Sequence, residues 1–295
     1  MNKKSTYILF IVLIVLVAGI AAKNYFSKNN QKAMIAGQKL LAADIVDSID
    51  KIEIKKGANA ATLEKKAGVW FVSSEQNYPA SPNLVQNLVS SLKDGALSSI
   101  ADNTLDQLPA YQLDEASRTT LNVQKEGSTV GNLWIGRAGD SYGTYYVVKE
   151  GLNKVYLTQN IYSNFAETEW RDRKILQTNK DEITSIKITL PKETFDLIKT
   201  ENKWQIANRD VKQEKIDALL NQLALLSAND FPPAGFSFTE NGTKLEIKLA
   251  NDSKTIIFGQ TLENGQVAIK NNDGLIYIIT KETADVLTKN QRSYF

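Results

Sequence analysis

Histidine and cysteine are both absent from this chain of 295 residues. A serine triad uses histidine as its base, and zinc sites take their nitrogen and sulfur ligands from histidine and cysteine, so the sequence argues against both kinds of chemistry. Without cysteine the chain forms no disulfide, although this absence does not identify the compartment. We therefore predict a protein that is not an enzyme, with no catalytic, cofactor-binding or metal-binding residues. Lysine, serine and carboxylate chemistry stays open, and no calcium-loop spacing supports a hard-cation site.

Two motifs that resemble catalytic sites lack what the chemistry needs. Gly139–Gly143 fits the G-x-S-x-G pattern of a nucleophile elbow, but no histidine exists to activate Ser141, and the segment lies between two predicted strands. We expect a hairpin loop there. Glu167, Glu169 and Asp172 crowd one helix end, whereas the carboxylates of a glycosidase face each other across a cleft. These acids are expected to form a solvated face.

The body of the chain carries no net charge. Two of the 35 basic residues, Lys3 and Lys4, precede residue 23, which leaves 33 basic residues against 33 acidic ones. Nucleic-acid binding depends on neutralising phosphates, so a neutral body is not expected to bind DNA or RNA. The 42% hydrophobic and 23% charged residues are typical of a globular protein.

One apolar run lies near the N-terminus. Met1–Lys4 is a short basic start, and Tyr7–Ala22 is uncharged and apolar over 16 residues, just under the roughly 17 to 25 of a spanning helix. We predict that residues 1–22 form an uncleaved membrane anchor, that 23–43 form a juxtamembrane tether, and that the body lies outside the cytoplasm of a bacterial cell. The alternatives are a cleaved signal peptide and a buried segment.

The chain contains an internal duplication. The segment Asp47–Val72 reappears as Asp181–Ile206 without insertion or deletion, at an offset of 134. Downstream the offset falls to 121, as expected of deletions in surface loops, because a deletion inside a strand would invert its buried face. We predict two homologous domains, residues 44–176 and 177–295. The aligned residues include Ile52 with Ile186, Ile54 with Ile188, Trp70 with Trp204, Val155-Tyr156 with Ile276-Tyr277, and Arg171 with Arg292.

Each copy is predicted to be an α+β domain, a mainly antiparallel sheet with a helix packed on one face. Hydrophobicity of period two places Ile52 and Ile54 on one side of a strand. Ser81-Pro82 is expected to begin the helix of the first copy. In the second copy, Asp210 is expected to cap the helix with Gln213 at the capping-box position. Each copy is expected to end on a short helix, near Thr158–Trp170 and Thr280–Gln291.

Two sets of aromatic and basic residues have both a structural and a functional reading. Trp70 and Trp204 occupy equivalent strand positions, and we expect both to be core anchors between sheet and helix rather than ligand platforms. Trp170, Arg171 and Arg173 lie in the densest charged cluster and are candidates for binding a partner. The structural alternative is that Arg171 meets backbone carbonyls or an acid of its own domain.

The order of several short motifs carries a family resemblance. The chain has, in sequence, the motifs Tyr111-Gln-Leu-Asp114, Leu133-Trp-Ile-Gly136, Tyr145-Tyr-Val-Val148, Val155-Tyr156 and Trp170-Arg-Asp-Arg173. This order resembles the bacterial family known as domain of unknown function 4340, over nearly the whole chain beyond the tether. The second copy departs from it, with Phe236-Ser-Phe238 in place of Tyr111-Gln-Leu113. Members typically have one N-terminal membrane helix, and some are encoded near gliding-motility-type ABC transporter components. The resemblance implies an anchored extracytoplasmic accessory protein and supplies no catalytic residue.

Two classes of function follow from these observations. The first is a non-catalytic interaction or accessory subunit of an envelope complex, tethered to the membrane through Tyr7–Ala22, with an ABC transporter as one setting and a protein as its partner. The second is a binding module for an envelope polymer or a small solute. A contiguous exposed apolar patch would favour the first, and a concave pocket lined by exposed aromatic residues would favour the second.

Overall fold

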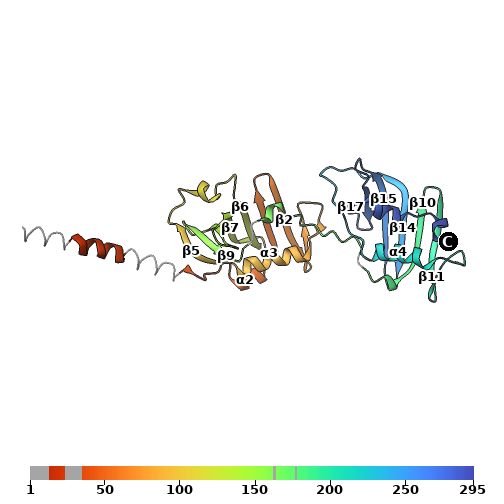
Figure 1. Cartoon of the computed structure of the whole chain (residues 1–295), viewed down its shortest axis with the longest axis horizontal. Helices are drawn as coiled ribbons and strands as arrows, with labels where there is room; N and C mark the ends of the chain where they lie inside the picture. Colours follow the sequence, from red (N-terminus) through yellow and green to blue (C-terminus); the bar gives the residue numbers. More distant parts are fainter. Residues whose placement is uncertain (1–12, 24–34, 162–163, 177) are drawn as a thin grey trace, which may run out of the picture. The chain divides into compact units, whose positions relative to one another are not determined.

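The chain folds into two compact units, Met1–Arg171 and Asp172–Phe295 (Figure 1). The computed structural model describes residues 13–23, 35–161, 164–176 and 178–295. The basic start Met1–Lys4, residues 7–12 of the apolar run and residues 24–34 of the predicted tether lie outside the described residues. The sequence placed the boundary between residues 176 and 177, five residues later than the division between the units.

The first unit is built on a nine-stranded sheet. Its strand order is β4-β3-β2-β1-β6-β7-β8-β9-β5, and every neighbouring pair is antiparallel. The strands are β1 (Lys51–Lys56), β2 (Asn59–Lys66), β3 (Val69–Val72), β4 (Tyr78–Pro79), β5 (Ala96–Asp102), β6 (Thr119–Lys125), β7 (Ser128–Ala138), β8 (Tyr145–Lys149) and β9 (Val155–Gln159). The helices are α2 (Ala43–Asp47), α3 (Pro82–Asp94) and the 3-10 turns η1 (Leu108–Tyr111) and η2 (Asn164–Glu167).

The second unit repeats this plan with eight strands. Its order, β13-β12-β11-β10-β14-β15-β16-β17, matches the first unit from β4 to β9, and the pairs are again antiparallel. The strands are β10 (Ile183–Leu190), β11 (Glu193–Thr200), β12 (Lys203–Ile206), β13 (Arg209–Asp210), β14 (Glu240–Leu249), β15 (Ser253–Thr261), β16 (Val267–Asn271) and β17 (Ile276–Ile279). The helices are α4 (Gln213–Ala224), α5 (Lys281–Leu287) and the 3-10 turns η3 (Lys180–Glu182) and η4 (Gln291–Tyr294).

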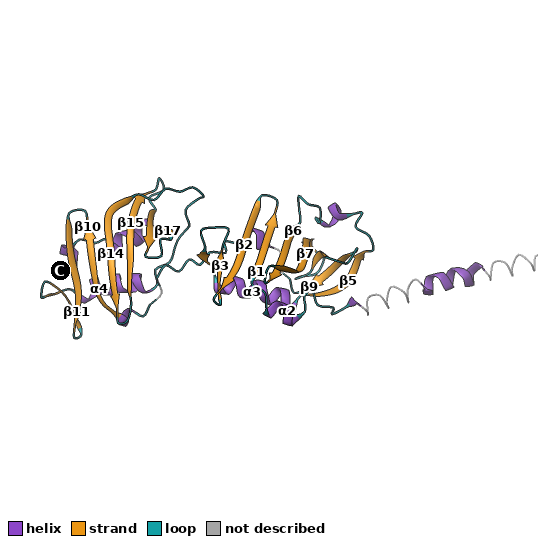
Figure 2. Cartoon of the chain, turned by 180° about the vertical axis from the view of Figure 1, so that it is seen from behind, coloured by secondary structure: helices purple, strands orange, loops and turns teal. Residues whose placement is uncertain are grey.

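In both units, strands account for more residues than helices do (Figure 2). The prediction that each of the two domains contains a mainly antiparallel sheet is therefore confirmed. The alternating pattern explains the central strands: Ile52 and Ile54 of β1, like Ile186 and Ile188 of β10, are at most 1% exposed. Burial of one such side chain contributes about 1.5 to 3 kcal/mol, so the alternation fixes which face of each strand points inward.

The helix of the first unit begins where the sequence predicted. Pro82 stands at the first turn of α3, and Leu88 and Leu92 are fully buried in the same hydrophobic cluster as Ile52 of the sheet. The 3.6-residue period brings these two leucines to one side of the helix. Ser81 is the N-cap residue, although its side chain accepts no capping hydrogen bond.

One prediction about helices is wrong. Asp210 does not cap α4, because it lies in β13 and its carboxylate accepts hydrogen bonds from Lys203 and Gln205, and Lys212 is the N-cap residue. The short helix expected near Thr158–Trp170 is the 3-10 turn η2, which is shorter than the predicted range because β9 runs to Gln159. The second closing helix was predicted correctly, as α5.

Residues 13–23 form a separate helical segment with an apolar surface. Leu13, Val15 and Ile20 are each between 55% and 64% exposed. Among the described residues, no helix has both the length and the apolar character needed to cross a membrane.

Candidate functional site

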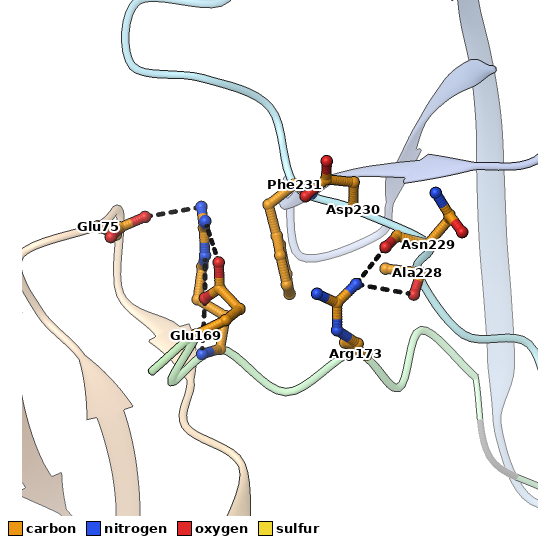
Figure 3. A network of polar contacts seen from close by, with 8 residues as sticks. Glu75, Glu169, Arg173, Ala228, Asn229, Asp230 and Phe231 are labelled. Carbon is orange, nitrogen blue, oxygen red and sulfur yellow. Dashed lines mark hydrogen bonds and ion pairs between the residues drawn. The ribbon is translucent and has the colours of Figure 1, made fainter. Parts of the chain in front are cut away.

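Arg171 lies at the centre of an ion-pair network in the first unit. Its Nη1 is 2.7 Å from Oε2 of Glu75, and its Nη2 is 2.6 Å from Oε2 of Glu169. Its Nε also donates a hydrogen bond to Oε1 of Glu169 at 2.8 Å, which makes the Glu169 pair bidentate (Figure 3). The arginine side chain is 12% exposed, whereas the two glutamates are 43% and 33% exposed. The network therefore joins the loop after β3 to the end of the unit.

The surroundings of Arg171 favour its charged form. Burial alone would lower the pKa of Arg171, but the hydrogen bond with Glu169 and the negative charges of Glu169 and Glu75 outweigh it, so the pKa is raised. The guanidinium carbon also lies 5.5 Å from the centre of the Tyr78 ring, within the range of a cation–π contact. Arg171 is therefore charged at neutral pH. These contacts agree with the structural alternative for Arg171, in which the arginine pairs with an acid of its own domain instead of a partner.

Trp170 is a core residue of the first unit. Its side chain is 3% exposed, and its Nε1 donates a hydrogen bond to the carbonyl of Phe165 at 3.0 Å. Its own carbonyl accepts a hydrogen bond of 2.7 Å from the backbone of Ser81, directly before α3. The backbone of Lys212, directly before α4, donates the matching bond of 2.9 Å to the carbonyl of Tyr294.

These matched hydrogen bonds correct one alignment between the copies. They pair Trp170 with Tyr294, so Arg171 corresponds to Phe295 and not to Arg292. Trp170 and Tyr294 are both buried, whereas Arg292 is exposed. The sequence alignment of Arg171 with Arg292 is therefore wrong. It matched two arginines, whereas the structure matches the aromatic residues Trp170 and Tyr294.

Arg173 belongs to the second unit. Its Nη1 donates hydrogen bonds to the carbonyls of Ala228, at 3.4 Å, and of Asn229 (Figure 3). Its guanidinium lies 5.5 Å from the centre of the Phe231 ring. The three candidates for partner binding thus fall in two units, Trp170 and Arg171 in the first and Arg173 in the second. Each has contacts within its own unit, and a role in partner binding stays a prediction.

A polar cavity of about 400 Å³ borders the Arg171 network in the first unit. Glu75, Glu167 and Glu169 line it together with small side chains of β2. Two of these acids pair with Arg171, and Glu167 lies 3.1 Å from Nζ of Lys56. Basic side chains therefore neutralise the acids. Among the described residues, no group of three or more acidic side chains is placed to hold a metal ion.

The Tyr111 motif has a structural role that the sequence did not reveal. A side chain on Gly136 of β7 would collide with the backbone carbonyl of Tyr111, so only glycine permits the two segments to lie this close. In the second unit, a side chain on Gly259 would collide with the ring of Phe238. The two glycines, which the duplication aligns, preserve the same close approach although the motif itself has changed.

The segment Gly139–Gly143 lies in the loop between β7 and β8, as predicted. Thr144 Oγ1 donates a hydrogen bond of 2.6 Å to the carbonyl of Ser141, and Tyr142 is fully exposed at the tip. The loop contains no helix to support a nucleophile elbow.

The two aligned tryptophans occupy matching positions but different surroundings. Trp70 faces Lys65 across β2 and β3, and Trp204 faces Lys199 across β11 and β12. Trp204 is 4% exposed, as expected of a core anchor. Trp70 is only half-buried and borders a groove of about 430 Å³. The two tryptophans therefore occupy equivalent strand positions, as predicted. The prediction that both are buried core anchors holds for Trp204 and is wrong for Trp70.

Comparison with known families identifies the class of the chain. The family model described as a domain of unknown function (DUF4340) matches residues 70–244, which is more than half of the sequence. The chain therefore belongs to this family, as its motifs had indicated. Neither the curated proteins nor the solved structures give a match.

Proposed function

We propose that this protein is a membrane-tethered, extracytoplasmic and non-catalytic accessory subunit of a bacterial envelope complex, with an ABC transporter as one setting. The observation that carries the proposal is the helix at residues 13–23, whose apolar side chains are more than half exposed. Apolar side chains that are exposed along a whole helix need a partner other than water. A membrane supplies one, and the basic start Met1–Lys4 suits its surface.

The body suits an interaction role better than an enzymatic one. The chain has no histidine or cysteine, and the acids beside the Arg171 network are paired with Arg171 and Lys56. We also infer that α3 and α4 each cover one face of their sheet. The buried leucines of α3 in the same core as β1 support this layout.

Membrane retention tests the tether. Full-length protein is expressed in a bacterium, and the membranes are washed with alkaline carbonate. Wild-type protein is expected to stay in the membrane, and Leu16→Arg with Ile20→Arg to be released, because each arginine at the centre of an apolar helix costs about 2.5 to 3.5 kcal/mol. Val17→Leu is the matched control and should be retained. Release of the wild-type protein would refute the tether.

The absence of cysteine makes the orientation easy to measure. Tyr142→Cys would place one thiol at a fully exposed loop tip in a chain that otherwise has none. A membrane-impermeant maleimide should label it in intact spheroplasts. Labelling that requires lysis of the cells would place the body in the cytoplasm and contradict the proposal.

A further inference from the structure

The first unit has an open apolar groove between β3 and α3. The groove has a volume of about 430 Å³, and its walls include Val69, Trp70, Pro82, Val85 and Val89. None of the side chains that line it is charged. Val69, the first residue of β3, is 51% exposed.

The duplication provides an internal reference for this groove. The backbone of Ala80 donates a hydrogen bond of 2.8 Å to the carbonyl of Trp70, and Val211 donates one of 3.0 Å to that of Trp204. Together with the matching bonds before α3 and α4, these bonds show that equivalent residues of the two helices differ by 131 in number. Equivalent residues of β3 and β12 differ by 134. These two differences identify the residue of the second unit that corresponds to each residue lining the groove.

The second unit has charges where the groove has none. Lys203 replaces Val69 of the groove wall and forms an ion pair of 2.9 Å with Asp210, which replaces Pro79, the neighbour of the wall residue Ala80 in sequence. Asp217 replaces Gln86 and accepts a hydrogen bond of 3.0 Å from Gln213. Three charged positions of one copy are thus uncharged in the other.

The second unit also closes the space with its own side chain. Leu220 replaces Val89 and is 4% exposed, and Trp204 is buried to the same degree. In the first unit the shorter Val89 is half-buried and leaves Trp70 partly uncovered. At the position of Val89, the second copy therefore has a larger branched aliphatic side chain, and its tryptophan is covered.

We propose that the groove of the first unit binds an uncharged apolar segment of a partner protein, which inserts a leucine-like side chain against Trp70. This proposal rests on the proposed role as an interaction subunit and names the surface that serves it. A charged occupant is disfavoured, because the walls offer no counter-charge and burial of an unpaired charge is costly. Tryptophan is also one of the residue types that dominate binding energy at interfaces.

Fluorine NMR on the full chain in phosphatidylcholine nanodiscs tests the groove directly. The chain has four tryptophans, so incorporation of 5-fluorotryptophan gives four signals, and the probe is N-acetyl-leucinamide. We expect the Trp70 signal to shift saturably with a dissociation constant of about 1 mM, as suits so small a ligand, while the Trp204 signal stays in place. N-acetyl-lysinamide should bind at least about tenfold more weakly, since it brings a charge.

Variants that copy the second unit sharpen the test. Val69→Lys with Val89→Leu should weaken leucinamide binding at least about tenfold, because these side chains close the groove. Leu225→Lys, which makes the same kind of change at an exposed apolar residue of the second unit, should leave the Trp70 shift unchanged. If the double variant does not fold, Val89→Leu alone provides the same test, because it copies the buried Leu220 of the second unit.

Three outcomes would overturn the proposal: a Trp70 signal that does not move, equal binding of the two amides, or wild-type binding by a folded groove variant. The assay does not depend on the tether. Release from membranes with intact leucinamide binding would refute only the tether, and retention without leucinamide binding would refute only the groove.

Discussion

The different burial of the two tryptophans predicts unequal costs of truncation. Trp204→Ala removes a side chain that is 4% exposed and leaves an enclosed cavity, so both the lost transfer energy and the cavity contribute, about 3 to 5 kcal/mol in total. Trp70→Ala removes a half-buried side chain that already borders an open groove, so no enclosed cavity forms. The lost transfer energy alone is about 1 to 2 kcal/mol.

Calorimetry of the full chain can separate the two effects. For a unit of this size, 1 kcal/mol corresponds to roughly 4 °C in Tm. Trp204→Ala should therefore lower the transition of the second unit by about 12 to 20 °C, and Trp70→Ala that of the first unit by about 4 to 8 °C. Limited proteolysis, with sequencing of the fragments, assigns each transition to its unit. Equal losses for the two variants would refute the argument from burial.

Three further predictions concern single side chains. Gly136→Ala should destabilise the first unit by about 1 to 3 kcal/mol, since the new methyl group collides with the carbonyl of Tyr111, and a Tm equal to that of the wild type would contradict this. Burial raises the pKa of the Tyr294 hydroxyl, so as the pH rises the unfolded chain loses this proton before the folded chain does. The free energy of unfolding of the second unit should therefore fall by about 1.4 kcal/mol between pH 9 and pH 11. Tyr294→Phe should abolish that loss in alkaline urea titrations without destabilising the unit at pH 7, because the hydroxyl has no hydrogen-bond partner, and an unchanged alkaline loss would point to another group. Ser141 should not react with a fluorophosphonate probe, because no histidine is present to activate it, and labelling that disappears in Ser141→Ala would establish it as a nucleophile.

Local patterns predicted the strands well because their cause is local. The alternation around Ile52 and Ile186 follows from the two faces of a strand, and Pro82 marks a helix start because its ring fixes the first turn. Both features can be recognised within a short window of sequence. The two-unit architecture followed instead from comparing the two copies of the repeat.

A short sequence motif near the start of each copy marks the boundary between them. The backbone of Leu40 donates a hydrogen bond to the carbonyl of Gly95, and that of Ile175 donates the matching bond to Leu226. Each donor stands in a Lys-aliphatic-Leu triplet, beginning at Lys39 in the first copy and at Lys174 in the second. A second copy that begins with this triplet starts at Lys174, two residues after the first residue of the second unit, Asp172.

The candidate site could not be predicted because its partners are distant in sequence. Arg171 depends on Glu75, which lies in a loop that is three residues longer than its counterpart in the second copy, and no short pattern links the two. The exposure of Trp70 likewise depends on Val89 of α3 and becomes visible only beside Leu220 of α4. Contacts between elements, and not propensity within them, decide both features.

The mass of the detergent-extracted protein tests the central claim most directly. The full chain, extracted from native membranes in digitonin, is measured by mass photometry and compared with the 32.8 kDa of the chain alone. We predict a complex that contains at least one further protein and that dissociates in the Val69→Lys, Val89→Leu variant. A wild-type protein that is extracted as the chain alone would contradict its assignment as an accessory subunit.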